Sequence, residues 1–340
     1  MKNNPANILI TGATGLVGAQ LTLHLIRNGY DVCALRRSTS KLEIFNRIVG
    51  GFSGWEKKVT WIEGDVTNIY DVSEAVEGME SVFHCAAEIS FVPSDFNRMM
   101  RINANGTANL VNASLRAGVK RFVHISSVAA LGRSESQREI SESNTWKTSK
   151  LNSGYAISKY SAEREVWRAM EEGLNALIVN PSIILGPGNW RSGSAAFFDA
   201  VWNGLKFYPE GVTGFIDVRD VADCTIALWE KNCSGQRFIL SAENKPYRFV
   251  LDTIAEVLNK PKPSIRATPL LGNLAWRIEW LRSKISRHRP VITRETVRNS
   301  SQVWDYRNDK IRTELHHEFI PVERSLKDTG NIFLEEMRMK

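Results

Sequence analysis

The chain is poor in cysteine and has no long apolar run, and both shortages narrow what the protein can be. Its four cysteines (Cys33, Cys85, Cys224 and Cys233) lie far apart, with no CxxC pair and no histidine cluster near them. This pattern argues against a zinc site, predicts no metal, and indicates reduced thiols in a cytosolic protein. No stretch approaches the roughly 20 apolar residues of a membrane span, so we expect no integral membrane segment.

Targeting signals, repeats and low-complexity tracts are lacking as well. No apolar segment like that of a signal peptide precedes the first predicted strand, and we therefore expect a cytoplasmic protein. The formal net charge of +7 is spread along the chain, apart from a concentration of basic residues after Arg277. Since no recognised nucleic-acid motif accompanies this charge, we expect no nucleic-acid partner.

What the sequence does contain is an alternation of short apolar strands and helices up to Pro187. This pattern predicts an α/β fold with a doubly wound parallel sheet of Rossmann type. Beyond Pro187 the alternation loosens and the chain becomes helix-rich, which predicts a smaller C-terminal substrate lobe. We expect residues 1–181, with about 213–241, to form the nucleotide-binding domain, and residues 182–212 and 242–340 to form the lobe. The 340 residues suffice for one large core with such an addition.

The alternation begins with a glycine-rich turn between a strand and a helix. An apolar strand over residues 7–11 leads into three glycines at spacings of three, and helical periodicity then continues to Asn28. Gly12 permits the tight turn, Gly15 lets the backbone approach a pyrophosphate, and Gly18 lets the helix lie close to the strand. Because the helix N-terminus offers unpaired N–H groups to phosphates, this stretch predicts a dinucleotide site.

The second predicted strand, residues 30–35, is not followed by an acidic residue. About 20 residues past a glycine turn, an acid would bind the ribose 2′-hydroxyl of NAD. Arg36 and Arg37 stand there instead. A guanidinium fork binds a 2′-phosphate bidentately, so the sequence favours NADP(H) while leaving NAD(H) open. The alternative interpretation is that both arginines are solvated loop charges.

Two further segments carry features of a cofactor site. The strand predicted at residues 81–87 ends in the small residues Ala86 and Ala87, as a cofactor lying across the sheet edge requires. The helix predicted over residues 96–117 contains Asn103, Asn105 and Gly106, which are unfavourable in a helix interior. This conflict predicts a constraint from the site rather than from folding, with an ordinary partly exposed helix as the alternative.

Ser127, Tyr155 and Lys159 are the candidate catalytic residues. Tyr155 and Lys159 stand four apart at the start of a predicted helix, so their side chains share a face. A free phenol has a pKa of about 10, and we expect the neighbouring ammonium to lower it toward the working range. Ser127, at the end of the fifth predicted strand, would hold the substrate oxygen while Tyr155 protonates an alkoxide. A surface pair and a turn serine are the alternatives.

In order and spacing, these motifs resemble the extended short-chain dehydrogenases/reductases, which include sugar-nucleotide epimerases, 3β-hydroxysteroid dehydrogenases and dihydroflavonol reductases. Residues 11–18 (TGATGLVG) resemble the TGxxGxxG turn of this NAD-dependent epimerase/dehydratase family. Residues 84–87 (HCAA) resemble its HxAA strand end, and residues 103–107 (NANGT) its NxxGT helix motif. Ser127, Tyr155 and Lys159 map onto its catalytic serine, tyrosine and lysine.

The resemblance implies specific contacts. An arginine at the position of Arg37 binds the adenosine 2′-phosphate in the dihydroflavonol-reductase branch, which the sequence resembles most, together with the 3β-hydroxysteroid dehydrogenases. The implied cofactor contacts are Gly12, Thr14, Gly15, Leu16, Val17, Arg36, Arg37, Asp65, Val66, Ala86, Ala87, Asn103, Tyr155, Lys159, Pro181, Ile183 and Ile184. The implied substrate contacts are Glu88, Ser127, Tyr155 and Asn180.

We therefore predict an NADP(H)-dependent oxidoreductase acting on a carbonyl or secondary alcohol of a small to mid-sized molecule. The alternative is a sugar-nucleotide epimerase or dehydratase with tightly bound NAD, since asparagine at the position of Asn180 is also seen in sugar epimerases. A redox-sensing binding protein is a third class. The resemblance also implies a homodimer.

Three smaller predictions concern the C-terminal half. Asp220 is expected to cap a helix that continues through Trp229. Residues 270–289 combine apolar residues at helical spacing with basic flanks, which predicts a lid helix, with a membrane-surface helix as the alternative. His316 and His317 lack acidic or cysteine partners at ligand spacing, and we interpret both as surface residues.

Overall fold

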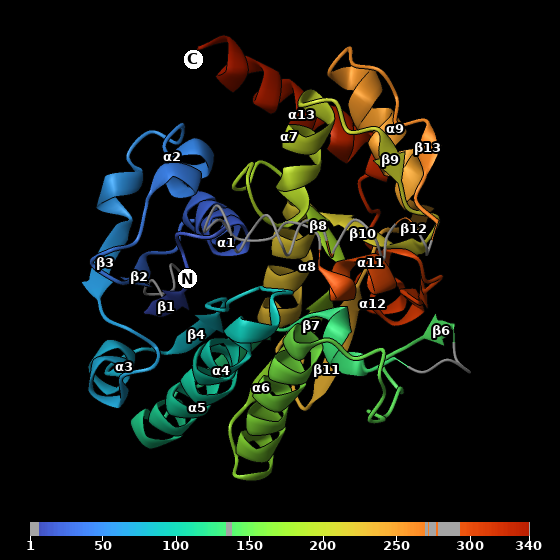
Figure 1. The fold of residues 1–340 in the computed structure, drawn as a ribbon. Helices are drawn as coiled ribbons and strands as arrows, with labels where there is room; N and C mark the ends of the chain where they lie inside the picture. The colour runs from blue at the N-terminus through green and yellow to red at the C-terminus, as the bar shows by residue number, and fades with distance from the viewer. Residues whose placement is uncertain (1–6, 134–137, 269–270, 272–276, 278–292, 340) are drawn as a thin grey trace.

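The computed structural model describes residues 7–133, 138–268, 271, 277 and 293–339, and its centre is a seven-stranded parallel sheet (Figure 1). The strand order is β11-β7-β5-β4-β1-β2-β3. Their bounds are β1 (Ile8–Thr11), β2 (Val32–Arg36), β3 (Val59–Glu63), β4 (Ser81–His84), β5 (Arg121–Ile125), β7 (Ala176–Pro181) and β11 (Gln236–Leu240). The order reverses between β1 and β4, where ligands bind in sheets of this kind.

Helices cover both faces of this sheet. Ile8 and Ile10 of β1 pack under α1 (Leu16–Arg27), α2 (Glu43–Val49) and α8 (Val218–Glu230). Leu9 points to the opposite face, which α3 (Ile69–Val76), α5 (Gly106–Ala117) and α6 (Gly154–Glu171) cover. This alternation follows from the two-residue period of a strand buried on both sides. The predicted Rossmann-type α/β fold is confirmed.

The helix predicted over residues 96–117 is not uniformly α-helical. It consists of α4 (Phe96–Met99), a π-helical turn (Met100–Asn105) and α5. Gly106 begins α5 against Val66, whose Cγ2 would lie 3.0 Å from a Cβ at that position. Asn103 and Asn105, which conflict with a regular helix, therefore lie in the π-turn and Gly106 directly follows it. Such turns are common at functional sites.

A second, three-stranded sheet joins β8 (Ile183–Leu185), β10 (Val212–Asp217) and β12 (Glu243–Pro246). This sheet packs with α7 (Ala196–Trp202), α9 (Tyr247–Val257) and α13 (Val322–Arg338). Together they enclose a separate apolar core that includes Phe198, Phe215 and Phe333. Within residues 213–241, β10 belongs to this sheet, whereas α8 and β11 lie with the main sheet. The division into domain and lobe stays a prediction.

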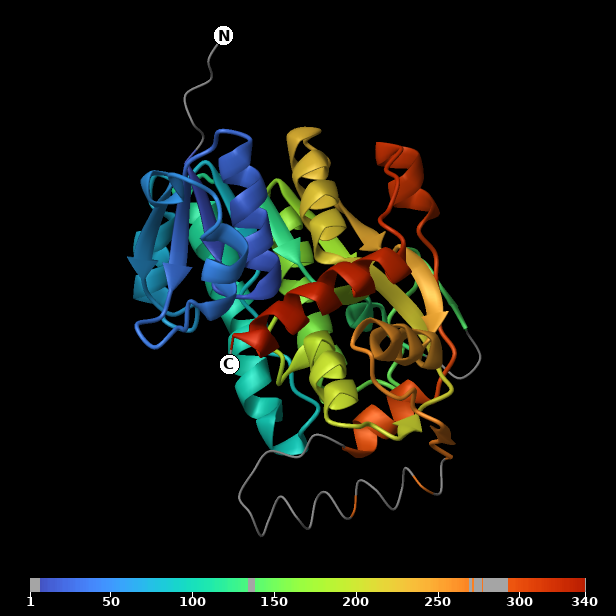
Figure 2. The ribbon, with the colours of Figure 1, turned by 90° about the horizontal axis from the view of Figure 1, so that it is seen from above.

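The remaining described strands and α-helices are short. They are β6 (Glu139–Ile140), β9 (Phe207–Tyr208), β13 (Ile265–Arg266), β14 (Asp305–Tyr306), α11 (Arg294–Ser300) and α12 (Asp309–Leu315). The last helix, α13, extends from this side of the molecule across to α1 and α2 (Figure 2). None of the described helices has the length and apolar character needed to cross a membrane. The predicted lid segment 270–289 lies outside the described residues, apart from Leu271 and Arg277.

Two predictions about α8 and its surroundings are wrong. The N-cap of α8 is Asp217, whose carboxylate accepts from the backbone N–H of Arg219 at 2.8 Å. Asp220 is instead buried, and its two oxygens accept from His317 Nε2 and from the Ile320 N–H, each at 2.9 Å. His317 is therefore not a free surface residue, because its ring is held against a buried carboxylate. Two carboxylates three residues apart both suit a helix start, and only tertiary contacts decide between them.

Candidate active site

The glycine turn lies against the end of β4. Gly12 has a φ of +70°, and a Cβ there would stand 2.6 Å from the backbone nitrogen of Ala86. A Cβ on Gly18 would collide with the Gly12 carbonyl oxygen. Gly15 is the N-cap of α1 and brings no capping side chain. The turn therefore excludes side chains where the backbone packs most closely and leaves the start of α1 available to an anion.

A directional series of hydrogen bonds, which we call the relay, ties this turn to β4 and the π-turn. The Thr107 hydroxyl donates to the Asn103 carbonyl at 2.5 Å, so it can only accept from His84 Nε2, 2.9 Å away. His84 Nδ1 is then the acceptor for the Thr11 hydroxyl at 2.7 Å, and Thr11 Oγ1 in turn accepts from the Ala86 N–H at 3.2 Å. The relay assigns the tautomer of His84 and leaves none of its bonding groups unpaired.

The relay requires a neutral imidazole, and the surroundings provide for one. Burial, and to a smaller extent the nearby Lys159 ammonium, lowers the pKa of His84 to about 3. Sequence reasoning missed this relay, although one of its members, His84, lies in the predicted strand and ends β4 in the structure.

Asn103 fastens the segment after β4 to α6. Its Oδ1 accepts from the Glu88 N–H at 2.7 Å, while its Nδ2 donates to the Glu88 carbonyl and to Ser158 Oγ, both at 2.9 Å. The side chain is 1% exposed. A polar residue unfavourable for a helix thus satisfies the backbone of a loop at the sheet edge. The Glu88 carboxylate pairs with Arg98. The predicted contacts of Asn103 with the cofactor and of Glu88 with the substrate stay predictions.

The structure brings Ser127, Tyr155 and Lys159 together. Ser127 follows β5 and caps a short 3-10 turn, its Oγ accepting from the Ala129 N–H at 3.2 Å. Tyr155, the second residue of α6, shares a hydrogen bond with the Ser127 side chain. One turn later, Lys159 is 2% exposed and its Nζ donates to the Ile125 carbonyl at 2.9 Å. Helix α6 therefore presents a phenol and an ammonium at the carboxyl end of β5.

The pKa of Tyr155 differs from the sequence-based expectation. Burial raises it to about 12, and the hydrogen bond with Ser127 offsets only part of that rise. Burial lowers the pKa of Lys159 to about 8, against the influence of the Glu163 carboxylate and the Cys85 thiol. We expected the ammonium to lower the phenol's pKa. Desolvation decides the direction of the shift instead, and the Lys159 Nζ donates to a carbonyl on β5.

The other end of the candidate cofactor site lies at β2 and β3. The Arg36 guanidinium stacks 4.9 Å from the centre of the Trp61 ring. Arg37 is exposed, and its guanidinium has no partner among the residues that the structure describes. The Gly64 N–H donates to the Arg36 carbonyl at 2.9 Å, which places Asp65 and Val66 beside the arginines. Asp65 Oδ1 accepts from the backbone and hydroxyl of Thr67, each at 2.8 Å.

Asn180 and Pro181 end β7, and Ile183 and Ile184 begin β8. Asn180 is fully buried, and its Nδ2 donates to the Ser127 carbonyl at 2.9 Å and to Glu163 Oε1 at 2.5 Å. Its amide nitrogen is therefore occupied by protein acceptors. The prediction that Asn180 contacts the substrate stays a prediction, whereas its contact with the backbone of Ser127 is a finding.

Comparison with known proteins decides the family. Residues 8–240, which contain the glycine turn, the relay and the three candidate catalytic residues, match the model of the NAD dependent epimerase/dehydratase family. The chain belongs to this family. A putative dihydroflavonol 4-reductase from Synechocystis sp. (strain ATCC 27184 / PCC 6803 / Kazusa) is 30% identical over 334 residues, which cover 95% of this chain and 93% of that protein.

Solved structures agree on the fold of this epimerase/dehydratase-family chain. The crystal structure of gox2253 matches with a TM-score of 0.80 and 28% identity, covering 99% of this chain and 100% of that one. A UDP-glucose 4-epimerase from Thermotoga maritima matches with a TM-score of 0.76, covering 97% and 99%, and at 22% identity it supports the fold alone. Curated relatives carry the names of reductases and dehydrogenases, and the protein is an oxidoreductase of this NAD(P)-binding family.

The residues of this family member fit a dinucleotide. Gly12, Gly15 and Gly18 place no side chains of their own at the turn and the start of α1, and the relay fixes the sheet edge beside it. Arg37, directly after β2, offers a cation that has no partner within the part of the chain that the structure describes. Among the described residues, no three histidine, cysteine or acidic side chains gather as metal ligands.

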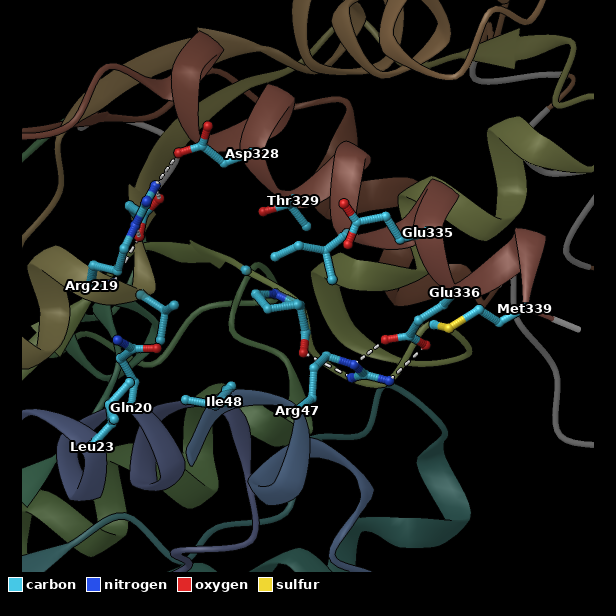
Figure 3. A pocket seen from close by; sticks show the side chains of 15 residues that line it. Gln20, Leu23, Arg47, Ile48, Arg219, Asp328, Thr329, Glu335, Glu336 and Met339 are labelled. Atoms are coloured by element: carbon cyan, nitrogen blue, oxygen red, sulfur yellow. Dashed lines mark hydrogen bonds and ion pairs between the residues drawn. The ribbon is translucent and has the colours of Figure 1, made fainter. Parts of the chain in front are cut away.

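A groove of about 440 Å³ lies apart from the candidate catalytic residues, between α1, α2 and α13 (Figure 3). At its rim, Arg47 of α2 pairs with Glu336 of α13 and donates to the carbonyls of Pro187 (3.0 Å) and Gly188 (2.8 Å). Arg47 thus joins the last helix to the segment that follows β8. None of Ser127, Tyr155 and Lys159 lines the groove.

Proposed function

We propose that the protein is an NADP(H)-dependent oxidoreductase that reduces a carbonyl, or oxidises a secondary alcohol, of a small to mid-sized molecule. The observation that carries this proposal is the meeting of Ser127, Tyr155 and Lys159 at the sheet edge that also holds the glycine turn. When bound, the nicotinamide cofactor would donate or accept the hydride.

Each of the three residues has a distinct role in this proposal. Tyr155 holds the proton that passes to the substrate oxygen during reduction, and burial keeps its phenol protonated at neutral pH. Ser127, hydrogen-bonded to Tyr155, orients that oxygen. Lys159 places an ammonium one helical turn away, where it would bind ribose hydroxyls and favour the phenolate once the proton has left.

Replacing Tyr155 by phenylalanine tests the acid/base role. The variant lacks only the hydroxyl, so turnover should fall by about 10² to 10⁴ while NADPH affinity stays near that of the wild type. Turnover is followed as NADPH absorbance, and binding as NADPH fluorescence. A Tyr155→Phe variant with unchanged turnover would rule out this assignment.

The preference for NADP(H) rests on Arg37. Arg36 is stacked on Trp61, whereas Arg37 is exposed and free to form a bidentate contact with a 2′-phosphate. We expect Arg37→Ala to weaken NADPH binding by about 10- to 100-fold, since hydrogen bonds to charged groups contribute about 1.5–3 kcal/mol. NADH binding should not change. Arg116→Ala, at an exposed position in the last turn of α5, is the control.

The same titrations separate the proposal from its alternative. A wild type that prefers NADH would contradict the role given to Arg37. Tightly held NAD(H) in the purified protein, with no consumption of added NADPH, would instead favour a sugar-nucleotide epimerase or dehydratase.

We further propose a homodimer in the cytoplasm that acts on a small molecule and binds no nucleic acid. The support is the resemblance of the sequence to the extended short-chain dehydrogenases/reductases. Light scattering during size-exclusion chromatography tests the dimer, and a monomeric mass at micromolar concentration would contradict it.

A further inference from the structure

We propose that Glu163 is a positioning residue for Ser127 and Lys159, and that its buried carboxylate keeps the Lys159 ammonium charged. The inference rests on the proposed function, because it assumes that Ser127 and Lys159 act as described there.

The Glu163 carboxylate is buried yet well supplied with donors. It lies one turn after Lys159 on α6 and is 1% exposed. Its Oε1 accepts from Ser126 Oγ and Asn180 Nδ2, both at 2.5 Å, and its Oε2 lies 3.4 Å from Arg237 Nη1. Donors and a cation compensate the charge of a carboxylate that is removed from water, and Glu163 has both. Glu163 is thus a fixed negative charge behind the three candidate catalytic residues.

The same contacts hold the backbone around Ser127. Ser126, whose hydroxyl donates to Glu163, directly precedes Ser127, and its N–H donates to the Val179 carbonyl at 2.8 Å. Asn180 donates to Glu163 and, through the same amide nitrogen, to the Ser127 carbonyl at 2.9 Å. Glu163 therefore joins α6 to the ends of β5 and β7, between which Ser127 is held.

Lys159 depends on this carboxylate for its charge. Burial lowers the pKa of the ammonium, and Glu163 is the stronger of the two groups that raise it again. The His84 and His124 rings beside Lys159 are neutral, because burial holds both of their pKa values well below the ordinary range. Burial likewise raises the pKa of Cys85 to about 12, so its thiol carries no charge at neutral pH.

The phenol of Tyr155, whose pKa is about 12, is also uncharged at neutral pH. Arg237 of β11 also faces the Glu163 carboxylate, with its Nη1 3.4 Å from Oε2. Among the described groups that face Lys159, Glu163 is therefore the one anion. Removing its charge should let Lys159 lose its proton at a lower pH.

The pH dependence of NADPH binding tests this role without needing the substrate. In the wild type, affinity measured by NADPH fluorescence should fall as the pH rises through about 8, where Lys159 loses its proton. In Glu163→Gln, which keeps the size but not the charge, the fall should move down by about one pH unit or more. In Glu163→Asp, which keeps the charge, the pH at which affinity falls should differ from that of the wild type by less than half of the shift in Glu163→Gln.

Glu165→Gln is the matched control, because Glu165 lies on the same helix and pairs with Arg168 on the surface. Its profile should coincide with that of the wild type. A Glu163→Gln profile that also coincides with the wild type overturns the inference, even when NADPH binds normally and the proposed function stands. A wild type that binds no NADPH overturns the proposed function and this inference with it.

A second variant covers the case in which Glu163→Gln shows no cooperative thermal transition. Arg237→Gln keeps the Glu163 carboxylate and its hydrogen bonds from Ser126 and Asn180, but it removes the facing cation, whose charge opposes that of Glu163 at Lys159. The fall in affinity should then move to higher pH than in the wild type. A fall that stays in place or moves to lower pH overturns the inference.

Discussion

Replacing His84 by glutamine should make the protein less sensitive to acid. His84 is 1% exposed, joins Thr11 to Thr107, and has a pKa near 3 in the folded protein because it is buried. In the unfolded chain an ordinary histidine titrates near 6.5. Between these values the unfolded state binds a proton that the folded state does not bind. The contribution of the neutral His84 ring to stability is therefore fully present above about pH 6.5 and is lost as the pH falls toward 3.

The size of the effect follows from the two pKa values. Lowering the pH by one unit within this interval lowers the free energy of unfolding by about 1.4 kcal/mol. Lowering the pH from 7.5 to 5.0 therefore lowers it by about 2 kcal/mol through His84 alone. Glutamine does not titrate and can still donate to Thr107 from the position of Nε2. The loss of unfolding free energy between these two pH values should therefore be about 2 kcal/mol smaller in His84→Gln than in the wild type.

His317→Gln is a matched substitution that should change the pH dependence of stability in the opposite direction. The hydrogen bond with buried Asp220 raises the pKa of His317, so the protonated ring stabilises the fold in acid and loses this effect as the pH rises through the folded value. Its replacement should make the acid loss steeper, not shallower. Urea unfolding at pH 7.5 and 5.0, monitored by tryptophan fluorescence, gives the three pairs of free energies.

A His84→Gln variant that loses as much stability as the wild type between the two pH values would contradict this effect of His84. A change of the pH dependence in the same direction in both variants would contradict it as well. A mere weakening of the fold cannot imitate the expected result, because it lowers stability at both pH values by the same amount.

Two further substitutions test the packing of the turn and of the last helix. Gly18→Ala should weaken NADPH binding by about 5- to 150-fold, the equivalent of 1–3 kcal/mol of overpacking against Gly12, while Gly51→Ala, with open space around it, should have no effect. Arg47→Met should lower the free energy of unfolding by about 1–3 kcal/mol, because Glu336 and the carbonyls of Pro187 and Gly188 lose their donor. Arg116→Met is its surface control, and equal stability of the two variants would refute the role of Arg47.

Most of the main sheet could be predicted because its signals are local. Strand periodicity, the three glycines and the helix that follows them all lie within short windows, and α1 begins at Leu16 as the spacing requires. The meeting of Ser127 with Tyr155 is also within reach of sequence, since parallel strands end at one edge and a helix start follows. The placement of β10 is not, because its pairing with β8 and β12 is long-range.

The contacts of buried polar side chains are harder to predict from sequence. The sequence shows that Asn103 conflicts with helix propensity. The structure places it in a π-turn, where its side-chain amide binds the backbone of Glu88. This arrangement depends on the loop after β4, which the sequence does not place. Only the family resemblance assigned Asn180 to the substrate site. Its contact with Ser127 depends on β5 and β7 being neighbours, and its contact with Glu163 depends on α6 covering them.

The pKa of Tyr155 shows where such inference ends. A spacing of four residues places an ammonium on the same helix face, but it does not tell where the ammonium points or how dry the phenol is. Here Lys159 donates to Ile125, and burial keeps Tyr155 protonated. A phenol that holds its proton until negative charge develops on the substrate oxygen suits the reduction direction. Oxidation requires the phenolate, so it should need a higher pH than reduction with the same substrate pair. Equal pH optima in the two directions would argue against Tyr155 as the group that transfers the proton.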